Sequence, residues 1–377
     1  MSKPSLRIGI ACWPTFGGSG VVATEIGLAL ADQGHEIHFL AHEYPVRLSG
    51  FRGNVFYHQV SVPDYPLFKY PPYALALATK MAEVAENHHL DLIHAHYAIP
   101  HSVSAHLAKE MSHRDDLKII ATLHGTDITI VGNDTSYTRV TRFSIEKADG
   151  VTAVSKYLTA ETHRIFDIER HIETIPNFID LERFQMRSCP EADSLRQAGE
   201  TVLIHVSNFR PVKRVFLLVK AFAALAAERP ARLLMVGDGP DRAAAEALAT
   251  ELGVQERVHF LGSQDAVETI IPCADIFVLP SRFESFGLSA LEAMACGVPV
   301  IGARGGGLPE VVVEGETGWL FEADELDSLT TILVKAAADK EHLKVMGQAA
   351  RRRAEEHFAL QDIVPRYEKF YREVLGN

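Results

Sequence analysis

The chain has 377 residues, of which 47% are apolar and 23% charged, and its formal net charge at pH 7 is −12. A chain of this length is expected to form two globular domains, because a domain usually has about 100–200 residues. The negative charge argues against nucleic acid and anionic membrane surfaces as partners, since both favour clusters of Lys and Arg. The negative net charge is still compatible with a small anionic substrate, because such a substrate needs only a few well-placed cations.

Four cysteines are spread along the chain without a CxxC pair. Cys12, Cys273 and Cys296 stand in apolar stretches, so we expect buried thiols and a reduced, cytoplasmic compartment. The N-terminus lacks the apolar core and cleavage site of a signal peptide. No uncharged apolar stretch of about 18 residues or more occurs, so no spanning helix and no stable membrane association are expected.

In the first half of the chain, short apolar runs alternate with segments of helical period. This alternation is typical of βαβ units and predicts a parallel sheet. We expect a glycine loop at residues 17–20 followed by a helix through Ala31, and further helices at Ala74–Glu86 and Ser102–Met111. The expected strands are Leu6–Ala11, Glu36–Ala41, Val55–Val60, Leu92–Ala95, Ile119–Leu123 and Gly150–Val154.

A second series of the same kind begins near Thr201, so we predict an α/β protein of two Rossmann-like, doubly wound domains that face each other across a cleft. Ligands of such sheets bind at the carboxyl ends of the strands. The predicted domains are residues 1–176, with the C-terminal helix 361–377 packing back on them, and residues 177–360, with a linker near 176–200. The expected strands of the second domain are Val202–Val206, Arg232–Val236, Val258–Leu261, Ile276–Leu279 and Pro299–Ile301.

Two glutamates eight residues apart, Glu284 and Glu292, are the strongest chemical signal. Ser285 is a plausible N-cap of the helix that carries Glu292, and the N–H groups and dipole of a helix N-terminus favour a phosphate. Glu292 could then reach ribose hydroxyls. Alternatively, Glu284 is a first-turn residue that complements the helix dipole, and Glu292 is a solvated helix residue.

Two cations, Arg210 and Lys213, follow the strand Val202–Val206. Such a pair at the carboxyl end of a strand suits a pyrophosphate, although isolated Lys and Arg are often simply solvated surface residues. The glycines at 17–20 lack GxGxxG spacing, so a tight turn explains them as well as a phosphate contact does. The motifs at 237–240 and 305–310 are similarly compatible with plain turns.

His124 follows the strand Ile119–Leu123 and is placed to touch a substrate, although a lone histidine is more often structural. His94 and His96 are expected to point to opposite faces of their strand and therefore not to form a metal site. The chain has no HExxH motif and no DxD motif that would hold a metal on a diphosphate. No metal is therefore implied. Arg142 either binds an anionic acceptor or pairs with Glu146.

The C-terminal half resembles the retaining glycosyltransferases with two Rossmann-like domains (GT-B fold, family 4 type). The resemblance rests on Glu284 and Glu292 together with NFRPVKR, GDGP and GGGLPE in this order. The N-terminal half is similar to members of that family that serve bacillithiol biosynthesis, through CWPTFGGSGVVATEIG, FKYPPY, IHAHYAIPH, TLHGTDIT, RFSIEKADGVTAVS and IPNFID. The similarity extends from about Arg7 to Tyr371.

The resemblance implies transfer of N-acetylglucosamine from UDP-N-acetylglucosamine to the hydroxyl of L-malate by a homo-oligomer, with retention and without metal or cofactor. The catalytic residues it implies are Glu284, His124, Arg210 and Lys213. The donor-binding residues it implies are Gly18, Asn208, Arg210, Lys213, Glu284, Ser285, Phe286, Gly287 and Glu292. The acceptor-binding residues it implies are Ser19, Tyr97, Thr122, Arg142 and Asn177.

Three other functions are compatible with the same motifs. A glycosyltransferase with a lipid-linked acceptor would need a basic amphipathic surface, which the charge of −12 disfavours. A UDP-sugar epimerase would turn over UDP-sugar without an acceptor. A non-catalytic sensor of nucleotide sugars would bind without turnover. The complete charged set argues against a sensor, and its members are Glu284, Glu292, Arg210, Lys213 and His124.

Overall fold

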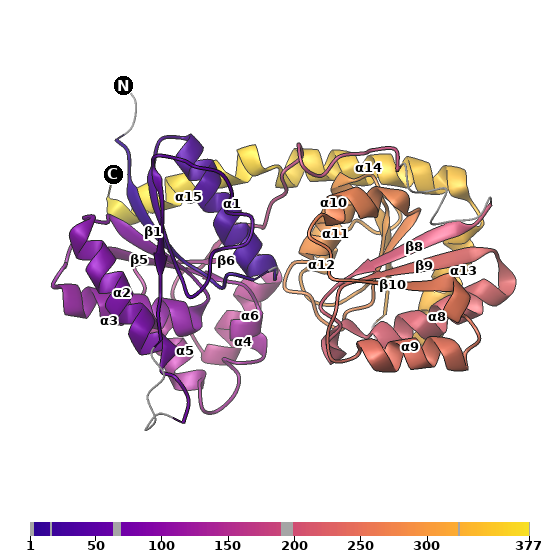
Figure 1. Ribbon diagram of the computed structural model, residues 1–377, viewed down its shortest axis with the longest axis horizontal. Helices are drawn as coiled ribbons and strands as arrows, with labels where there is room; N and C mark the ends of the chain where they lie inside the picture. Colours follow the sequence, from indigo (N-terminus) through magenta and orange to yellow (C-terminus); the bar gives the residue numbers. More distant parts are fainter. Residues whose placement is uncertain (1–3, 16, 63–68, 190–198, 323–324, 377) are drawn as a thin grey trace. The chain divides into compact units, whose positions relative to one another are not determined.

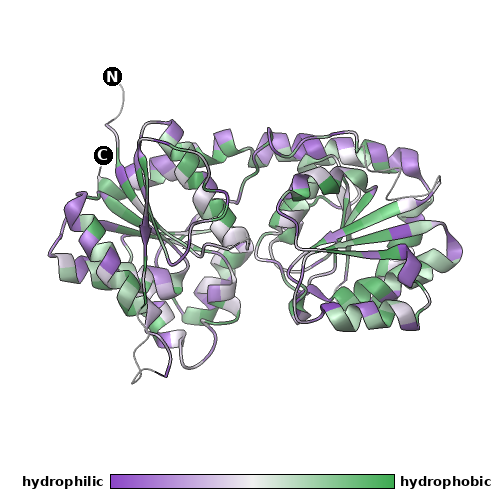
Figure 2. Ribbon diagram, in the orientation of Figure 1, coloured by the Kyte–Doolittle hydropathy of each residue, from purple (hydrophilic) through white to green (hydrophobic). Residues whose placement is uncertain are grey.

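The computed structural model describes residues 4–15, 17–62, 69–189, 199–322 and 325–376. The chain divides into two compact units, Met1–Asn177 with Gln361–Asn377, and Phe178–Leu360. Each unit has a parallel sheet with helices on both faces (Figure 1), and Figure 2 shows hydrophobic residues along the strands and along parts of the helices. Two doubly wound α/β units were predicted, and this part of the fold prediction is confirmed.

The sheet of the first unit has the order β3-β2-β1-β4-β5-β6-β7, and all its pairs are parallel. The direction of winding changes between β1 and β4, which is where open α/β sheets bind ligands. The short strand β7 was not predicted. The bounds are β1 (Arg7–Ala11), β2 (Glu36–Ala41), β3 (Val55–Gln59), β4 (Leu92–His96), β5 (Lys118–Leu123), β6 (Gly150–Ala153) and β7 (Glu173–Thr174).

The helices of the first unit include α15, the C-terminal helix, whose apolar side packs on the sheet. Its Tyr367 and Tyr371 are fully buried, and the Tyr371 hydroxyl lies 2.7 Å from Nδ1 of His94 on β4. The bounds are α1 (Gly18–Asp32), α2 (Tyr73–Asn87), the π-helix η1 (Ala98–Ser102), α3 (Val103–Ser112), α4 (Thr126–Thr129), α5 (Thr138–Lys147), α6 (Lys156–Phe166) and α15 (Leu360–Leu375).

The sheet of the second unit has the order β10-β9-β8-β11-β12-β13, so its winding changes between β8 and β11. The strand β13 was not predicted. Its strands are β8 (Thr201–Val206), β9 (Ala231–Val236), β10 (Val258–Gly262), β11 (Ile276–Leu279), β12 (Val300–Ala303) and β13 (Gly318–Phe321). Its helices are η2 (Pro211–Lys213), α8 (Val215–Glu228), α9 (Arg242–Glu251), η3 (Gln255–Arg257), α10 (Val267–Ile270), η4 (Ile271–Cys273), α11 (Leu288–Ala295), α12 (Leu308–Val311), α13 (Leu326–Ala337) and α14 (Lys340–Phe358).

The glycine stretch after β1 is helical, which corrects the predicted loop at 17–20. The helix α1 begins at Gly18, and Gly20 lies in its first turn. A Cβ on Gly20 would be 2.3 Å from the carbonyl oxygen of Trp13, so only glycine allows the helix to start this close to the preceding segment. None of the helices among the described residues is both long and apolar enough to cross a membrane.

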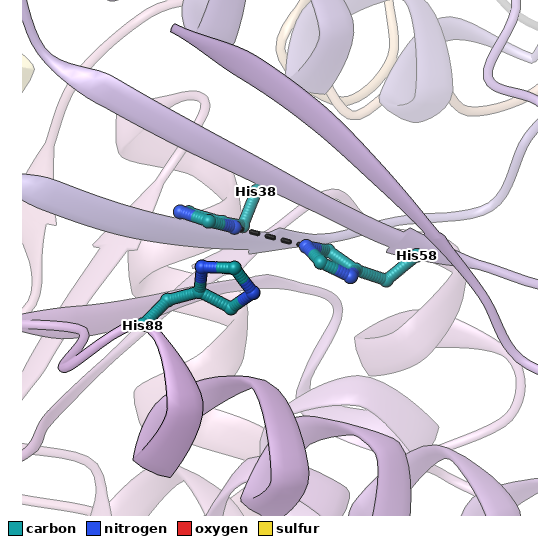
Figure 3. A group of neighbouring side chains, drawn as sticks. All are labelled: His38, His58 and His88. Carbon is teal, nitrogen blue, oxygen red and sulfur yellow. Dashed lines mark hydrogen bonds between the residues drawn. The ribbon is translucent and has the colours of Figure 1, made fainter.

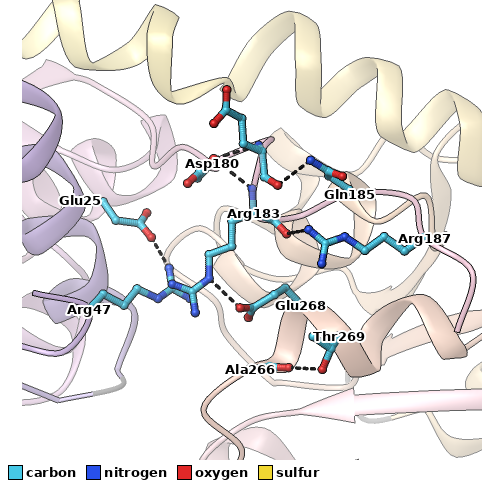
Figure 4. A network of polar contacts seen from close by, with 10 residues as sticks. Glu25, Arg47, Asp180, Arg183, Gln185, Arg187, Ala266, Glu268 and Thr269 are labelled. Atoms are coloured by element: carbon cyan, nitrogen blue, oxygen red, sulfur yellow. Dashed lines mark hydrogen bonds and ion pairs between the residues drawn. The ribbon is translucent and has the colours of Figure 1, made fainter. Parts of the chain in front are cut away.

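The segment that follows Asn177 was predicted to be a linker; its residues 190–198 lie outside the described residues. Where it is described, it is anchored on the second unit. The Asp180 carboxylate accepts the backbone N–H groups of Glu182 and Arg183, and the Arg183 guanidinium donates to Glu268 at 3.0 Å (Figure 4).

One expectation about the cysteines is wrong. Cys273 is not a free thiol but forms a disulfide with Cys189, and the two Cα atoms lie 5.1 Å apart. The sequence did not suggest the pair because the partners are 84 residues apart and only the fold brings them together. The expected buried thiols Cys12 and Cys296 are confirmed, and burial raises the pKa of each to about 12.

Candidate active site

The loops that follow β8 and β11 meet at the switch point of the second sheet. The Arg282 N–H in the loop after β11 donates to the Val212 carbonyl in η2, at 2.9 Å. Arg210 and Asn208, both predicted to bind the donor, are exposed residues of the loop after β8. The two loops therefore form one surface at the place where such sheets bind ligands.

Lys213 and Glu284 form an ion pair across these two loops. Lys213 Nζ donates to Glu284 Oε1 at 2.6 Å, and the two side chains are only 20% and 14% exposed. A partly buried ammonium of this kind interacts strongly with anions, because water screens it poorly. The structure thus brings together two of the predicted catalytic residues, with the lysine already held in a defined position.

Glycines after β9 and β12 support these loops through close backbone contacts. A Cβ on Gly237 would lie 1.8 Å from the Ser207 carbonyl oxygen, and a Cβ on Gly306 would lie 2.0 Å from the Glu284 carbonyl oxygen. The Gly307 N–H donates to that same Glu284 carbonyl at 2.7 Å. The two glycine motifs are therefore positioning elements for the loops that carry the predicted site residues, a role that the sequence did not reveal.

The helix α11 begins after a left-handed residue, and this corrects the predicted cap. Gly287 has φ +98° and is the N-cap, so Ser285 lies two residues before the cap position. Phe286 is buried next to Phe358, with ring centroids 5.6 Å apart. Glu292 is 8% exposed, which excludes the alternative of a solvated helix residue.

His205 on β8 is a buried polar residue of this region that sequence reasoning missed. Its Nδ1 lies 2.8 Å from the Val278 carbonyl oxygen and its Nε2 lies 2.7 Å from the Ser207 hydroxyl. Burial lowers the pKa of His205 to about 4, so the ring is neutral, with Nδ1–H donating to Val278 and Nε2 accepting from Ser207. It fixes Ser207 at the start of the loop after β8. A single histidine inside a strand gives no sequence signal of this role.

In the first unit, four polar side chains share one face of β4 and β5. His94 and His96 were predicted to point to opposite faces, which is wrong: their ring centroids are 4.2 Å apart, because residues i and i+2 of a strand share a face. His94 Nε2 lies 2.6 Å from the Thr122 hydroxyl oxygen, and His96 Nδ1 lies 2.9 Å from His124 Nε2.

These histidines are buried and neutral. Burial, together with the smaller effect of a neighbouring imidazole, lowers the pKa of His94 and that of His124 to about 3. The pKa of His96 lies well below its ordinary value for the same reasons. His124 is 8% exposed and is therefore able to offer a neutral imidazole to a ligand, not a cation.

Asp127 shapes the loop after β5. Its carboxylate accepts the backbone N–H groups of Gly125 (2.9 Å), His124 (3.2 Å) and Ala98 (3.0 Å). Burial raises the pKa of Asp127 to about 6, although these N–H donors act in the opposite direction. The carboxylate joins the segments after β4 and β5 and holds His124 in place. The sequence placed Asp127 near the site but did not suggest this role.

The predicted acceptor residues of the first unit differ in whether their side chains are already bonded to other residues. The Tyr97 ring lies near His124, with centroids 5.4 Å apart, and Ser19 is in the first turn of α1. Asn177 follows β7, and its buried Oδ1 makes no hydrogen bond among the described residues. Thr122, by contrast, is fully buried and bonded to His94 and Thr152. Arg142 donates to Glu146 at 2.9 Å.

Solved structures of glycosyltransferases share this fold. A glycosyltransferase from Rickettsia africae has a TM-score of 0.80 at 18% identity, covering 100% of both chains. Alr3699/HepE from Anabaena, in complex with UDP and glucose, has a TM-score of 0.80 at 22% identity, covering 97% of this chain and 98% of that one. Identities this low establish the fold alone, which is the two-domain GT-B fold.

Sequence comparison identifies the family to which the chain belongs. The model of Glycosyltransferase Family 4 matches residues 16–183, and that of Glycosyl transferases group 1 matches residues 191–353. The N-acetyl-alpha-D-glucosaminyl L-malate synthase of Bacillus anthracis is 47% identical over 372 residues, covering 98% of this chain and 97% of the relative. The chain belongs to the glycosyltransferase family that includes this synthase.

Proposed function

We propose that this glycosyltransferase transfers N-acetylglucosamine from UDP-N-acetylglucosamine to the hydroxyl of L-malate, as the first step of bacillithiol biosynthesis. The observation that carries the proposal is the 47% identity over nearly the whole chain to a synthase of N-acetyl-alpha-D-glucosaminyl L-malate. The donor loops of the second unit support the proposal, because they place cations at the switch point of the sheet, where a diphosphate fits.

The proposed reaction proceeds with retention and without a metal. Lys213 and Arg210 take the place of a cation on the diphosphate, and Glu292 binds the ribose. When the diphosphate binds Lys213, Glu284 is free to accept hydroxyls of the donor sugar. Malate's hydroxyl attacks the anomeric carbon from the face that UDP leaves, and the leaving diphosphate takes the hydroxyl proton. The side chains contribute positioning and electrostatic stabilisation.

The proposed acceptor site lies in the first unit and includes Ser19, Tyr97 and Asn177, with His124 beside the reacting sugar. The unpaired Oδ1 of Asn177 supports this assignment, because a buried acceptor atom without a partner gains by binding a hydroxyl. Thr122 contributes through His94 instead of touching malate itself. Arg142 would have to leave Glu146 to bind a malate carboxylate.

Incubation of the pure, EDTA-treated protein with UDP-N-acetylglucosamine, with and without L-malate, tests the proposal. We expect UDP release that requires malate and a product with the mass of N-acetylglucosaminyl malate. Release only with another acceptor, such as a lipid carrier, would reject malate and keep the transferase. Turnover of UDP-sugar without any acceptor would indicate an epimerase or hydrolase, and tight UDP binding without turnover would indicate a sensor.

A further inference from the structure

Three histidines outside the candidate active site meet at the edge of the first sheet. His38 lies on β2, His58 on the edge strand β3, and His88 directly after α2. One ring nitrogen of each lies within 4.8 Å of those of the other two, and Figure 3 shows the three rings gathered around a common point. The parallel register pairs Leu40 with His58, so His38 and His58 lie on the same face of neighbouring strands.

The hydrogen bonds of His38 set its tautomer. His38 Nε2 lies 3.0 Å from Glu36 Oε1, and a carboxylate can only accept, so Nε2 carries the proton. His38 Nδ1 is therefore unprotonated, and its lone pair points at His58 Nε2 at 2.9 Å. This lone pair accepts the His58 N–H in the structure. An imidazole whose far nitrogen donates to a carboxylate is the arrangement that orients metal-ligating histidines.

We propose that His38, His58 and His88 bind a divalent late first-row transition-metal ion, with zinc as the representative, and that Glu36 orients His38 for this purpose. The ion replaces the proton between His38 Nδ1 and His58 Nε2, and His58 then carries its proton on Nδ1. Three imidazole nitrogens suit zinc, and the fourth tetrahedral position is left to water.

The geometry needs only a small adjustment to hold the ion. Zinc–nitrogen bonds of about 2.0–2.1 Å in a tetrahedron place two ligand nitrogens roughly 3.3 Å apart. The His38–His58 pair at 2.9 Å therefore has to open by a few tenths of an ångström. Phe56 stacks on His38 with centroids 4.9 Å apart and limits its movement. The ion would tie the edge strand to the end of α2 and so stabilise the edge of the sheet.

The charges near the cluster are compatible with a cation. Burial lowers the pKa of His38, and burial together with the neighbouring imidazoles lowers the pKa of His58 to about 4. Both rings are thus neutral, the form that binds metals, at pH 7. The nearby Lys80 ammonium is paired with Glu83 at 2.6 Å, which offsets its repulsion of an ion.

Zinc titration of the full-length, tag-free, chelator-stripped protein tests the site by calorimetry, with Co²⁺ absorption as a second readout of tetrahedral nitrogen ligation. We expect one zinc per chain at the cluster, a loss of at least tenfold in affinity in His58→Ala and in His88→Ala, and a ten- to hundredfold loss in Glu36→Gln. His89→Ala is the matched control, because His89 is the exposed neighbour of His88 and should bind zinc as the parent protein does.

His88→Ala keeps the test valid if His58→Ala does not fold, because His88 is only partly buried at the end of a helix. An unchanged affinity and Co²⁺ spectrum in folded His88→Ala would overturn the proposal. A loss of zinc binding in His89→Ala equal to that in His88→Ala would do the same, as would a parent protein that binds no zinc. None of these outcomes depends on the transferase reaction, so they leave the proposed function untouched.

Discussion

At the scale of single residues, the candidate site residues of the two units differ in charge. The second unit has an ion pair, and the first unit has a set of neutral imidazoles. Lys213 is held at 2.6 Å by Glu284, so its ammonium is oriented before a ligand arrives. His94, His96 and His124 are uncharged and buried beside one another. In the proposed reaction, Lys213 and Arg210 therefore supply the cationic stabilisation of the leaving diphosphate, whereas the histidines provide shape and hydrogen bonds.

Replacing Lys213 by Ala is expected to lower kcat by about a hundredfold or more, because a charged contact to the leaving group acts mainly in the transition state. KM for malate should change little. Steady-state kinetics with both substrates measure the two effects. Lys220→Ala, an exposed lysine of α8, is the control and should keep full activity. Equal losses in kcat and in malate affinity would argue against this role of Lys213.

Acid is expected to destabilise the first unit. Histidines titrate near pH 6.5 in the unfolded chain but near 3 at His94, His101 and His124 in the folded one, so below pH 6.5 the unfolded state binds more protons. The free energy of unfolding is therefore unaffected by these histidines above pH 6.5. As the pH falls towards 4, each histidine lowers it by up to about 1.4 kcal/mol per pH unit. Asp127 acts in the opposite direction, because its pKa is raised to about 6 and its carboxyl therefore takes up a proton more readily in the folded chain. This partly offsets the stability lost at one histidine.

Urea unfolding of Trp319→Phe at several pH values measures this loss. Trp13 is then the remaining one of the two tryptophans, and it lies 4.9 Å from His101 between ring centroids, so it reports on the first unit. Replacing the exposed His171 by Asn should leave the pH dependence unchanged. A free energy of unfolding that is constant from pH 7 to 5 would refute the neutral histidine cluster.

At the scale of elements, the loops of the second unit depend on glycines that lie after other strands. Gly306 approaches the Glu284 backbone so closely that the two form an isolated β-bridge. Gly237 and Gly239 support the Ser207–Phe209 backbone in the same manner. The loop after β12 thus positions the Glu284 loop, and the loop after β9 positions the loop that leads to Arg210.

Gly306→Ala is expected to abolish most of the activity, because its Cβ would displace the Glu284 carbonyl, 2.0 Å away. Gly315→Ala is the matched control. Both residues have positive φ, +70° and +74°, but a Cβ on Gly315 meets nothing within 4 Å. Both variants should lose about 1 kcal/mol of stability through backbone strain, whereas only Gly306→Ala should lose turnover. Equal activity of the two variants in a UDP-release assay would contradict the positioning role.

The strands were predictable because buried parallel strands are nearly continuous apolar runs. All the expected strands appear with bounds within two residues of the prediction, and Glu36–Ala41 and Ile276–Leu279 agree at both ends. β7 has only two residues, and β13 is a short apolar run within a polar stretch, so neither gave a usable pattern. Left-handed Gly287 and the Cys189–Cys273 pair depend on tertiary contacts that the sequence does not display.

The candidate site was predictable in part, through the motifs that follow strands. The loops that follow the strands were the expected places for chemistry, and the structure joins Lys213 and Glu284, one from each of two such loops, directly. The supporting residues were missed, because Asp127 and His205 act through backbone groups far away in the sequence or through the partly buried hydroxyl of Ser207. The prediction for the histidine pair on β4 was wrong for another reason. The spacing of the two residues was visible in the sequence, but residues i and i+2 of a strand were wrongly assigned to opposite faces.

At the scale of the whole molecule, both units use the same winding. In each, the chain builds strands outward on one side and then on the other, and the loops with candidate functional residues flank the switch point. The second unit adds a disulfide that closes a long loop of the chain. Closing such a loop restricts the unfolded chain, and this is one model for how a disulfide stabilises a fold.

The disulfide predicts two, not four, titratable thiols in the unreduced, denatured chain, namely those of Cys12 and Cys296. Thiol counting in guanidinium measures this number. Cys189→Ser should lower the free energy of unfolding of the second unit by up to about 4 kcal/mol, from the length of the closed loop. The double variant with Cys273→Ser should be no less stable than the single one. Four reactive thiols would contradict the disulfide.

Proton NMR of the reaction tests the proposed retaining, metal-independent transfer to malate most directly. The protein, UDP-N-acetylglucosamine, L-malate and EDTA are combined, and the anomeric proton of the sugar is followed over time. We expect the α-anomeric signal of the donor to be replaced by an α-anomeric signal of a malate glycoside, at the rate of UDP release. A β-linked product, a free sugar, or a reaction that stops in EDTA and resumes with added metal would contradict it.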